Sequence, residues 1–142
     1  MKYKLIGIYE LVTGIFGAVL LIFITLQKIL EKSTQVLPSA LLGLLLFLGL
    51  AFSGYGLIKK KKYGRKYSLW LQGLQIIGFT FNSIQYIFTT SAFLALVIDS
   101  TIHVQTKLAL IDYNIDRVSV LFPLEIRIYI LPVILLLLLL KK

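Results

Sequence analysis

The 142-residue sequence contains no cysteine, a single histidine and a single tryptophan. Without cysteine the chain can form no disulfide bond, no thiolate nucleophile and no zinc–thiolate site. The sequence also lacks a nucleophile elbow, a zinc-protease helix motif and a glycine-rich phosphate loop. We therefore expect a protein without enzymatic activity and without a cofactor.

Acidic residues are scarce, because 6 Asp and Glu stand against 15 Lys and Arg, and the formal net charge is +9. In a soluble protein such an excess would suggest nucleic acid as a partner. Here the basic residues flank apolar blocks, where they would meet the anionic headgroups of lipids. We expect an anionic lipid bilayer as their partner, and no nucleic acid.

Apolar residues make up 58% of the chain, and its mean hydropathy is +0.92. They fall in blocks of about twenty residues, the length that crosses about 30 Å of hydrocarbon. A chain this short cannot bury all of them in a water-soluble core. The sequence therefore predicts an integral membrane protein.

Four segments are predicted to span the membrane as helices. Pro38 is well placed for the first turn of the second segment. The fourth segment is the shortest, because a start at Pro123 would put Glu125 and Arg127 on nearly opposite faces of its first turns. Its terminal lysines are expected to reach the headgroups. The predicted helices are residues 5–26, 38–58, 67–89 and 128–142.

Lysine and arginine predict the orientation, since cytoplasmic loops of membrane proteins are enriched in them. With four spans, both termini and the 59–66 loop lie on one side, together with ten cations and no acid. The other side holds five cations, balanced by five acids. We expect a multi-pass protein of the plasma (inner) membrane with both termini in the cytoplasm. The ten cations are Lys2, Lys4, Lys59, Lys60, Lys61, Lys62, Arg65, Lys66, Lys141 and Lys142.

Residues 92–127 lack helical periodicity. Over residues 102–110 and again over 118–130, apolar side chains stand mostly at even positions and polar ones mostly at odd positions. This period of two predicts half-buried strands. We expect a small antiparallel β-like element outside the membrane, with a turn at residues 112–116. The alternative is an irregular loop followed by a full-length fourth helix.

The predicted fold class is therefore an all-α membrane protein. It is a four-transmembrane-helix bundle with a small extracytoplasmic β-like element at about residues 92–127. The whole chain, residues 1–142, is expected to form a single integral membrane domain.

Small residues share one arc on each of the first two predicted helices, at about 100° per residue. Lipid acyl chains are as apolar as leucine, so helices in a bilayer associate through close packing rather than through the hydrophobic effect. Small side chains allow this close packing. These faces are predicted to pack against each other or against a partner. The predicted packing residues are Gly7, Gly14, Gly17, Gly43, Gly49 and Ser53.

Glu10 lies on the glycine arc of the first helix, about two turns inside the cytoplasmic boundary. A carboxylate at that depth must be paired or protonated. It could be a proton or cation site with Gln72 or Gln75 as hydrogen-bond partners. It could equally be a structural carboxyl bound to a neighbouring amide or to a cation of the inner loop.

Amide side chains share one arc of the predicted third helix. This stripe could line a polar path, as in a channel. It could also hold helices together through hydrogen bonds of about 0.6 kcal/mol each, and this interpretation is favoured. With Glu10 the stripe forms a candidate intramembrane polar site: Glu10, Gln72, Gln75, Asn82 and Gln85.

Residues 59–66 form a basic loop with two possible roles. It could bind anionic lipid headgroups, at about 1 kcal/mol for each cation near the surface. It could also do no more than hold the topology. The candidate headgroup residues are Lys59, Lys60, Lys61, Lys62, Arg65 and Lys66.

The sequence predicts no metal site. Asp112-x-Asn114-x-Asp116 matches the opening of a calcium loop, but Arg117 stands where the turn glycine belongs. Side-chain capping of a turn explains this motif better. His103 has no obvious ligand partner.

We expect an accessory or scaffold subunit that packs against a larger membrane protein or against its own copies. The small-residue faces and the absence of catalytic motifs favour this function. The alternative is an oligomeric ion or proton channel or carrier that uses Glu10 and the amide stripe.

Overall fold

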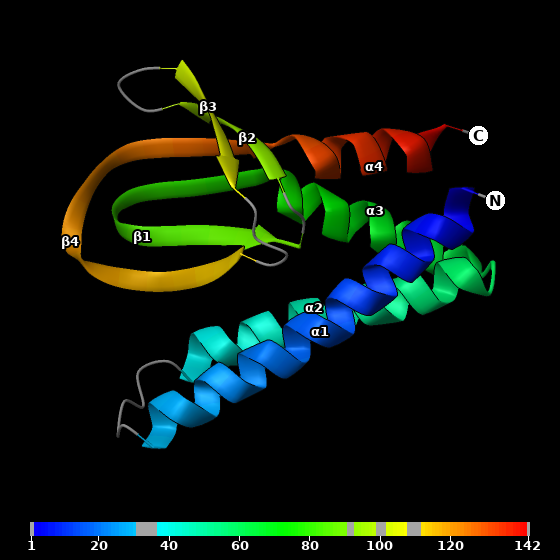
Figure 1. The fold of residues 1–142 in the computed structure, drawn as a ribbon, viewed down its shortest axis with the longest axis horizontal. Helices are drawn as coiled ribbons and strands as arrows, with labels where there is room; N and C mark the ends of the chain where they lie inside the picture. Colours follow the sequence, from blue (N-terminus) through cyan, green and yellow to red (C-terminus); the bar gives the residue numbers. More distant parts are fainter. Residues whose placement is uncertain (1, 31–36, 91–92, 99–101, 108–111, 142) are drawn as a thin grey trace. The chain divides into compact units, whose positions relative to one another are not determined.

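The computed structural model describes residues 2–30, 37–90, 93–98, 102–107 and 112–141 (Figure 1). The chain divides into two compact units, Met1–Leu71 and Gln72–Lys142. The first unit is helical, and the second contains a β-sheet.

Two long apolar helices, α1 (Lys2–Leu30) and α2 (Leu37–Ile58), form most of the first unit and lie side by side (Figure 1). Both are long and apolar enough to cross a membrane. At 1.5 Å per residue they extend over about 43 Å and 33 Å, which exceeds the roughly 30 Å of a hydrocarbon core. The first two predicted helices are confirmed as apolar helices of this length.

The helices α1 and α2 touch through glycines. A Cβ placed on Gly14 would lie 2.5 Å from the backbone nitrogen of Ala51 and 2.7 Å from the carbonyl oxygen of Phe47. A Cβ on Gly54 would lie 2.5 Å from the carbonyl oxygen of Gly7. No real side chain tolerates such distances, so the close approach of the two backbones depends on glycine.

Helix α3 (Lys62–Ile76) follows a short turn after α2. Gly56 and Gly64 let the two helices meet, since a Cβ on Gly64 would lie 2.4 Å from the carbonyl carbon of Gly56. The ring of Phe52 stacks on Tyr63 at 4.9 Å between centroids and meets the edge of Tyr67. Glycine contact and aromatic packing therefore fix the first turns of α3 against α2.

The predicted third span over residues 67–89 is wrong, because α3 ends at Ile76 and the chain continues as strand β1 (Ile77–Thr89). Over residues 77–81 exposed and buried residues alternate strictly. Ile77, Phe79 and Phe81 are exposed, while Gly78 and Thr80 are buried. A period of two belongs to a strand.

The second unit contains a four-stranded antiparallel sheet with the strand order β1-β4-β2-β3. Strands β2 (Phe93–Ile98) and β3 (Ile102–Lys107) form a hairpin, and β4 (Asp112–Tyr129) pairs with both β1 and β2. The long pair of β1 and β4 is strongly bent, and its register shifts on both sides of Asn82 (Figure 1). The predicted turn at residues 112–116 is wrong, since these residues pair with β1 inside strand β4.

Helix α4 (Ile130–Leu140) has 11 residues and contacts β2. It rises about 16 Å, which is too short to span a bilayer. Among the described residues, only α1 and α2 are candidate membrane spans. The predicted all-α bundle with four membrane-spanning helices is therefore wrong: the chain combines four helices with a four-stranded sheet.

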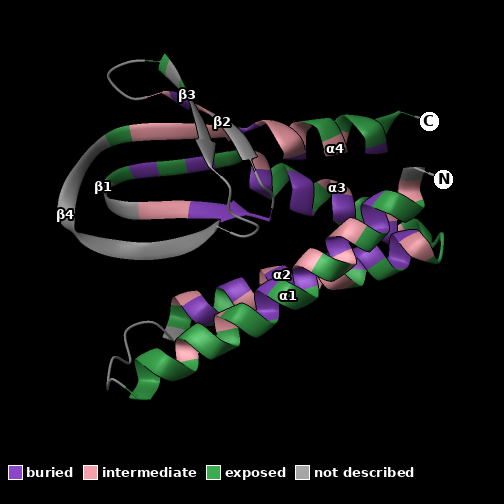
Figure 2. Cartoon of the chain, viewed as in Figure 1, coloured by how far each residue is buried: buried purple, intermediate pink, exposed green. Residues whose placement is uncertain are grey.

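Each unit has its own buried apolar residues, and exposed residues run along the whole of α1 (Figure 2). In the first unit the fully buried large apolar side chains include Phe47 and Leu50 of α2. In the second unit they include Phe88 of β1, Val97 of β2 and Tyr129 at the end of β4.

Candidate functional site

Glu10 joins the three helices of the first unit. Its side chain on α1 is completely buried. The hydroxyl of Ser53 on α2 lies 2.9 Å from Glu10 Oε2, and the hydroxyl of Ser68 on α3 donates to Glu10 Oε1. The carboxyl group therefore holds one hydrogen bond to each neighbouring helix.

The contacts around Glu10 are compatible with two arrangements of the hydrogen-bonding protons. Ser53 Oγ also lies 2.9 Å from the carbonyl oxygen of Leu50, yet a hydroxyl carries only one proton. An ionised Glu10 accepts that proton. A protonated Glu10 donates to Ser53, which then donates to Leu50. The site can hold or release a proton without losing the contact between Glu10 and Ser53.

Gln75 belongs to a different hydrogen-bond group. Its Oε1 accepts from the backbone nitrogen of Thr90 at 3.3 Å and from the Thr90 hydroxyl at 2.9 Å. Within the described part of the chain, Gln75 Nε2 has no hydrogen-bond partner. Gln72 is also fully buried, one turn earlier on α3. The described bonds of Gln75 thus tie α3 to the end of β1, whereas those of Glu10 go to serines.

The remaining amides of the predicted stripe lie on β1. Asn82 opposes Phe122, and Gln85 opposes Asp116 in the register with β4. A helical arc that includes Asn82 and Gln85 is therefore wrong, because the helix has ended six residues before Asn82. Only Gln72 and Gln75 share a helix face.

The predicted packing residues fall into two groups. Gly7, Gly14 and Gly17 contact α2 at distances that exclude a Cβ, and Gly43 is buried. Gly49 has only ordinary room, since a Cβ added there would lie 3.6 Å from the nearest atom of Leu71.

Ser53 was predicted as a packing residue, whereas Ser68, which supplies the second hydrogen bond to Glu10, was not predicted. The one signal for Ser68 was a small hydroxyl side chain next to an apolar stretch. Such a signal is weak, because a hydroxyl in a helix can bond its own backbone instead.

The basic segment 59–66 forms the turn between α2 and α3. Lys60 adopts a left-handed backbone with φ 53°, and two hydrogen bonds close the end of α2: Lys60 N to Leu57 O at 3.1 Å and Lys61 N to Gly56 O at 2.8 Å. This pattern is a Schellman motif, in which glycine is the usual left-handed residue. A lysine there costs about 1 kcal/mol of backbone strain.

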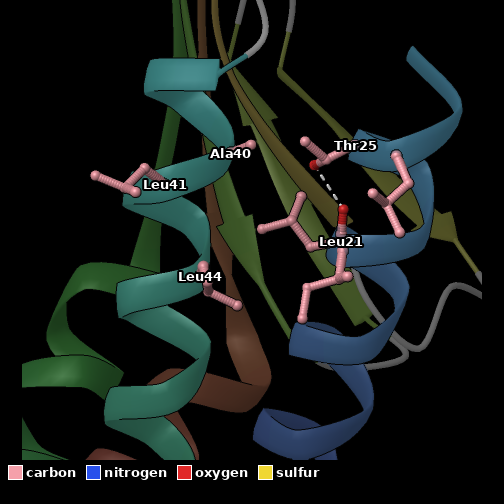
Figure 3. A pocket seen from close by; sticks show the side chains of 7 residues that line it. Leu21, Thr25, Ala40, Leu41 and Leu44 are labelled. Atoms are coloured by element: carbon pink, nitrogen blue, oxygen red, sulfur yellow. Dashed lines mark hydrogen bonds between the residues drawn. The ribbon is translucent and has the colours of Figure 1, made fainter. Parts of the chain in front are cut away.

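A cavity of about 170 Å³ lies where α1 and α2 separate beyond their glycine contacts (Figure 3). Its lining is almost entirely apolar, and the Thr25 hydroxyl bonds the carbonyl oxygen of Leu21 at 2.6 Å. The cavity therefore provides an apolar surface without a polar group to hold a ligand. The lining residues are Leu21, Ile22, Thr25, Leu26, Ala40, Leu41 and Leu44.

Two polar side chains are tied within the second unit. The Tyr86 hydroxyl donates to the carbonyl oxygen of Leu74 at 3.0 Å, and partial burial raises the pKa of this phenol. Arg127 pairs with Glu125. Burial alone would lower the pKa of Arg127, but its hydrogen bond to Glu125 and the charge of that carboxylate, with a smaller contribution from Tyr129, raise it instead. The first contact joins β1 to α3, and the second lies within β4.

Among the described residues, no three His, Asp or Glu side chains gather into a group that could hold a metal ion. The side chains of Asp112, Asn114, Asp116 and His103 lie outside the described part of the structure. Comparison with known protein families, with curated proteins and with solved structures gave no match. The function must therefore be inferred from the geometry of this chain.

Proposed function

We propose that the protein is a non-enzymatic accessory or scaffold protein of a membrane, anchored by α1 and α2. The observation that carries this proposal is the large number of exposed apolar side chains on the two helices. Burying one such side chain is worth about 1.5–3 kcal/mol, so a row of them is stable only against lipid or another protein. The row includes Leu5, Val12, Val19 and Phe23 of α1, and Leu41, Leu45, Leu48 and Phe52 of α2.

The proposed orientation places the basic segment 59–66 in the cytoplasm of a plasma (inner) membrane. This segment and the cations Lys2 and Lys4 flank one end of the hairpin, whereas Lys28 and Lys32 flank the other beside Glu31. The bias is the one typical of a cytoplasmic end. With two spans, everything after Ile58 stays on the cytoplasmic side, including the strands that the four-span prediction put outside.

Single cysteines test this topology, since the natural chain has none. We expect a membrane-impermeant maleimide to label Ser33→Cys on intact cells. Lys59→Cys and Val104→Cys should react only after lysis. Labelling of Val104→Cys on intact cells would contradict the two-span topology, and release of the protein by alkaline carbonate would contradict the membrane anchor.

A photo-crosslinking amino acid tests the accessory role. Placed at Phe23, whose side chain is 58% exposed, it should capture a partner in the native membrane. Placed at Phe47, which is 1% exposed, it should capture only this chain. A larger captured protein indicates an accessory subunit, and a second copy indicates a scaffold of identical chains.

The alternative function, an ion or proton channel or carrier, depends on Glu10. The two proton arrangements that its hydrogen bonds allow support that alternative, but the amide stripe does not form a helical path beside it. Flux through liposomes that Glu10→Gln abolishes, without crosslinks from Phe23, would replace the scaffold proposal.

A further inference from the structure

A cationic cavity of about 350 Å³ lies at the end of the first unit where α1 begins, α2 ends and α3 begins. Its size falls in the range of small-molecule sites. Five of its eight lining residues are cationic, and none is acidic. The lining residues are Tyr3, Lys4, Leu57, Ile58, Lys60, Lys61, Lys62 and Arg65.

The cavity combines side chains from separate parts of the sequence. Tyr3 and Lys4 come from α1, while the other cations follow α2 more than fifty residues later. The Arg65 guanidinium lies 5.9 Å from the centre of the Tyr3 ring, which helps to hold it at the cavity. The headgroup site predicted from the sequence consisted of the basic segment alone, without Tyr3 or Lys4.

Positive charge dominates this end of the first unit, because Glu10 is the only acidic residue in its described part. That carboxyl group lies about two turns farther along α1 and is bonded to Ser53 and Ser68. The five positive charges around the cavity repel one another, and a bound anion would reduce this repulsion. Leu57 and Ile58 make part of the lining apolar, which strengthens the attraction between the cations and an anion.

The strained backbone of Lys60 is a second, independent observation. Its left-handed conformation suits glycine, yet a lysine occupies the position and lines the cavity. Strained residues cluster at ligand sites, where the side chain is needed in a fixed place. The strain singles out Lys60 from its lysine neighbours, which have ordinary backbones.

We propose that this cavity binds a phosphate group, carried either by the headgroup of an anionic lipid or by a small soluble phosphate ester. The planar guanidinium of Arg65 can donate hydrogen bonds to two phosphate oxygens at once, and the ammonium groups of the lysines add positive charge around it. The proposed binding site lies within the first unit, and binding there does not require a protein partner.

Native mass spectrometry of the full chain in mild detergent tests the proposal. The probes are phosphatidylglycerol, phosphatidylcholine and glycerol 3-phosphate. We expect one phosphatidylglycerol molecule to be retained in preference to phosphatidylcholine. Retention of glycerol 3-phosphate with the same response to substitutions would identify a soluble ester, and its absence would identify the lipid headgroup.

Two pairs of variants decide whether a defined site exists. Lys60→Gly and Arg65→Gln remove cations that line the cavity, and each should weaken binding about fivefold, equivalent to about 1 kcal/mol. Lys59→Gln and Lys66→Gln remove neighbouring cations that do not line it, and each should change binding less than about twofold.

Lys60→Gly also separates binding from folding. It should raise the thermal stability of the protein, because glycine suits the left-handed backbone, while it lowers affinity for the phosphate. Equal losses in all four variants, or equal retention of phosphatidylglycerol and phosphatidylcholine, would overturn the proposal in favour of diffuse surface attraction.

Discussion

Replacing Gly14 by alanine tests the packing of the α1–α2 hairpin most directly. The new Cβ would meet Ala51 N at 2.5 Å and Phe47 O at 2.7 Å, whereas ordinary contact begins near 3.4 Å. Both atoms belong to the backbone of α2, so neither can move aside as a flexible side chain could. The two helices must separate by about 1 Å, which also weakens neighbouring contacts.

The matched control is Gly49→Ala on the facing helix. Its Cβ would lie 3.6 Å from the nearest Leu71 atom, which is ordinary contact. Alanine gains about 1 kcal/mol over glycine in a helix interior. Overpacking costs about 1–3 kcal/mol, and the upper end applies where backbone must move. We therefore expect Gly14→Ala to lose about 2 kcal/mol, and Gly49→Ala to gain up to about 1 kcal/mol.

Energy transfer between fluorophores at Leu26→Cys and Leu41→Cys provides the assay. Both residues line the apolar cavity between α1 and α2, away from the glycine contacts. Titration of SDS into mild-detergent micelles should separate the fluorophores earlier in Gly14→Ala than in Gly49→Ala. Equal midpoints for the two variants would refute the close packing of the backbones.

Two further predictions concern single hydrogen-bonded groups. Glu10→Gln should change hairpin stability by less than about 1 kcal/mol, since an amide can accept from Ser68 and donate to Ser53. Glu10→Ala should cost about 2–4 kcal/mol, because it removes the bonds to both buried serines, of which Ser53 can still donate to Leu50 O, and leaves a cavity. The SDS titration separates these variants, and equal losses would contradict the bonds to both serines. Burial raises the pKa of Tyr86 in the folded state, so its contribution to stability is complete below pH 10 and is lost as the pH rises through the folded pKa. Tyr86→Phe should therefore flatten the fall of stability above pH 10 in chemical unfolding of the protein, and an unchanged slope would contradict the raised pKa of the partly buried phenol.

The first unit was largely predictable because its signals are uniform. Each of the first two apolar blocks is long enough for one span, and the arc of Gly7, Gly14 and Gly17 marks the face that touches α2. The burial of Glu10 followed from its place on the same arc. Its serine partners could not be predicted in this way, because a hydroxyl in an apolar helix often bonds its own backbone. Thr13, for example, bonds the Tyr9 carbonyl oxygen at 2.8 Å.

The second unit was harder to predict because average hydropathy does not distinguish a helix from a strand. Residues 77–89 are rich in isoleucine and aromatic side chains, which suit both lipid and a sheet. The alternation of buried and exposed residues over 77–81 is the feature that favours a strand. The register of β1 with β4 shifts on both sides of Asn82. The helical spacing of Asn82 and Gln85 after Gln75 was a coincidence, because the helix ends at Ile76.

The proposed orientation of the termini is the same for two spans as for four, because both numbers are even. Two spans and four spans both return the chain to the side on which it began, so the termini and the basic segment 59–66 stay together. The difference concerns the strands, which the two-span proposal puts on the cytoplasmic side and the four-span prediction put outside. Arg127 and its partner Glu125 then no longer count against the cytoplasmic bias, because they lie far beyond the ends of the two helices in the sequence. The cations that decide the orientation of the two helices are then Lys2, Lys4 and the basic segment at one end, and only Lys28 and Lys32 at the other.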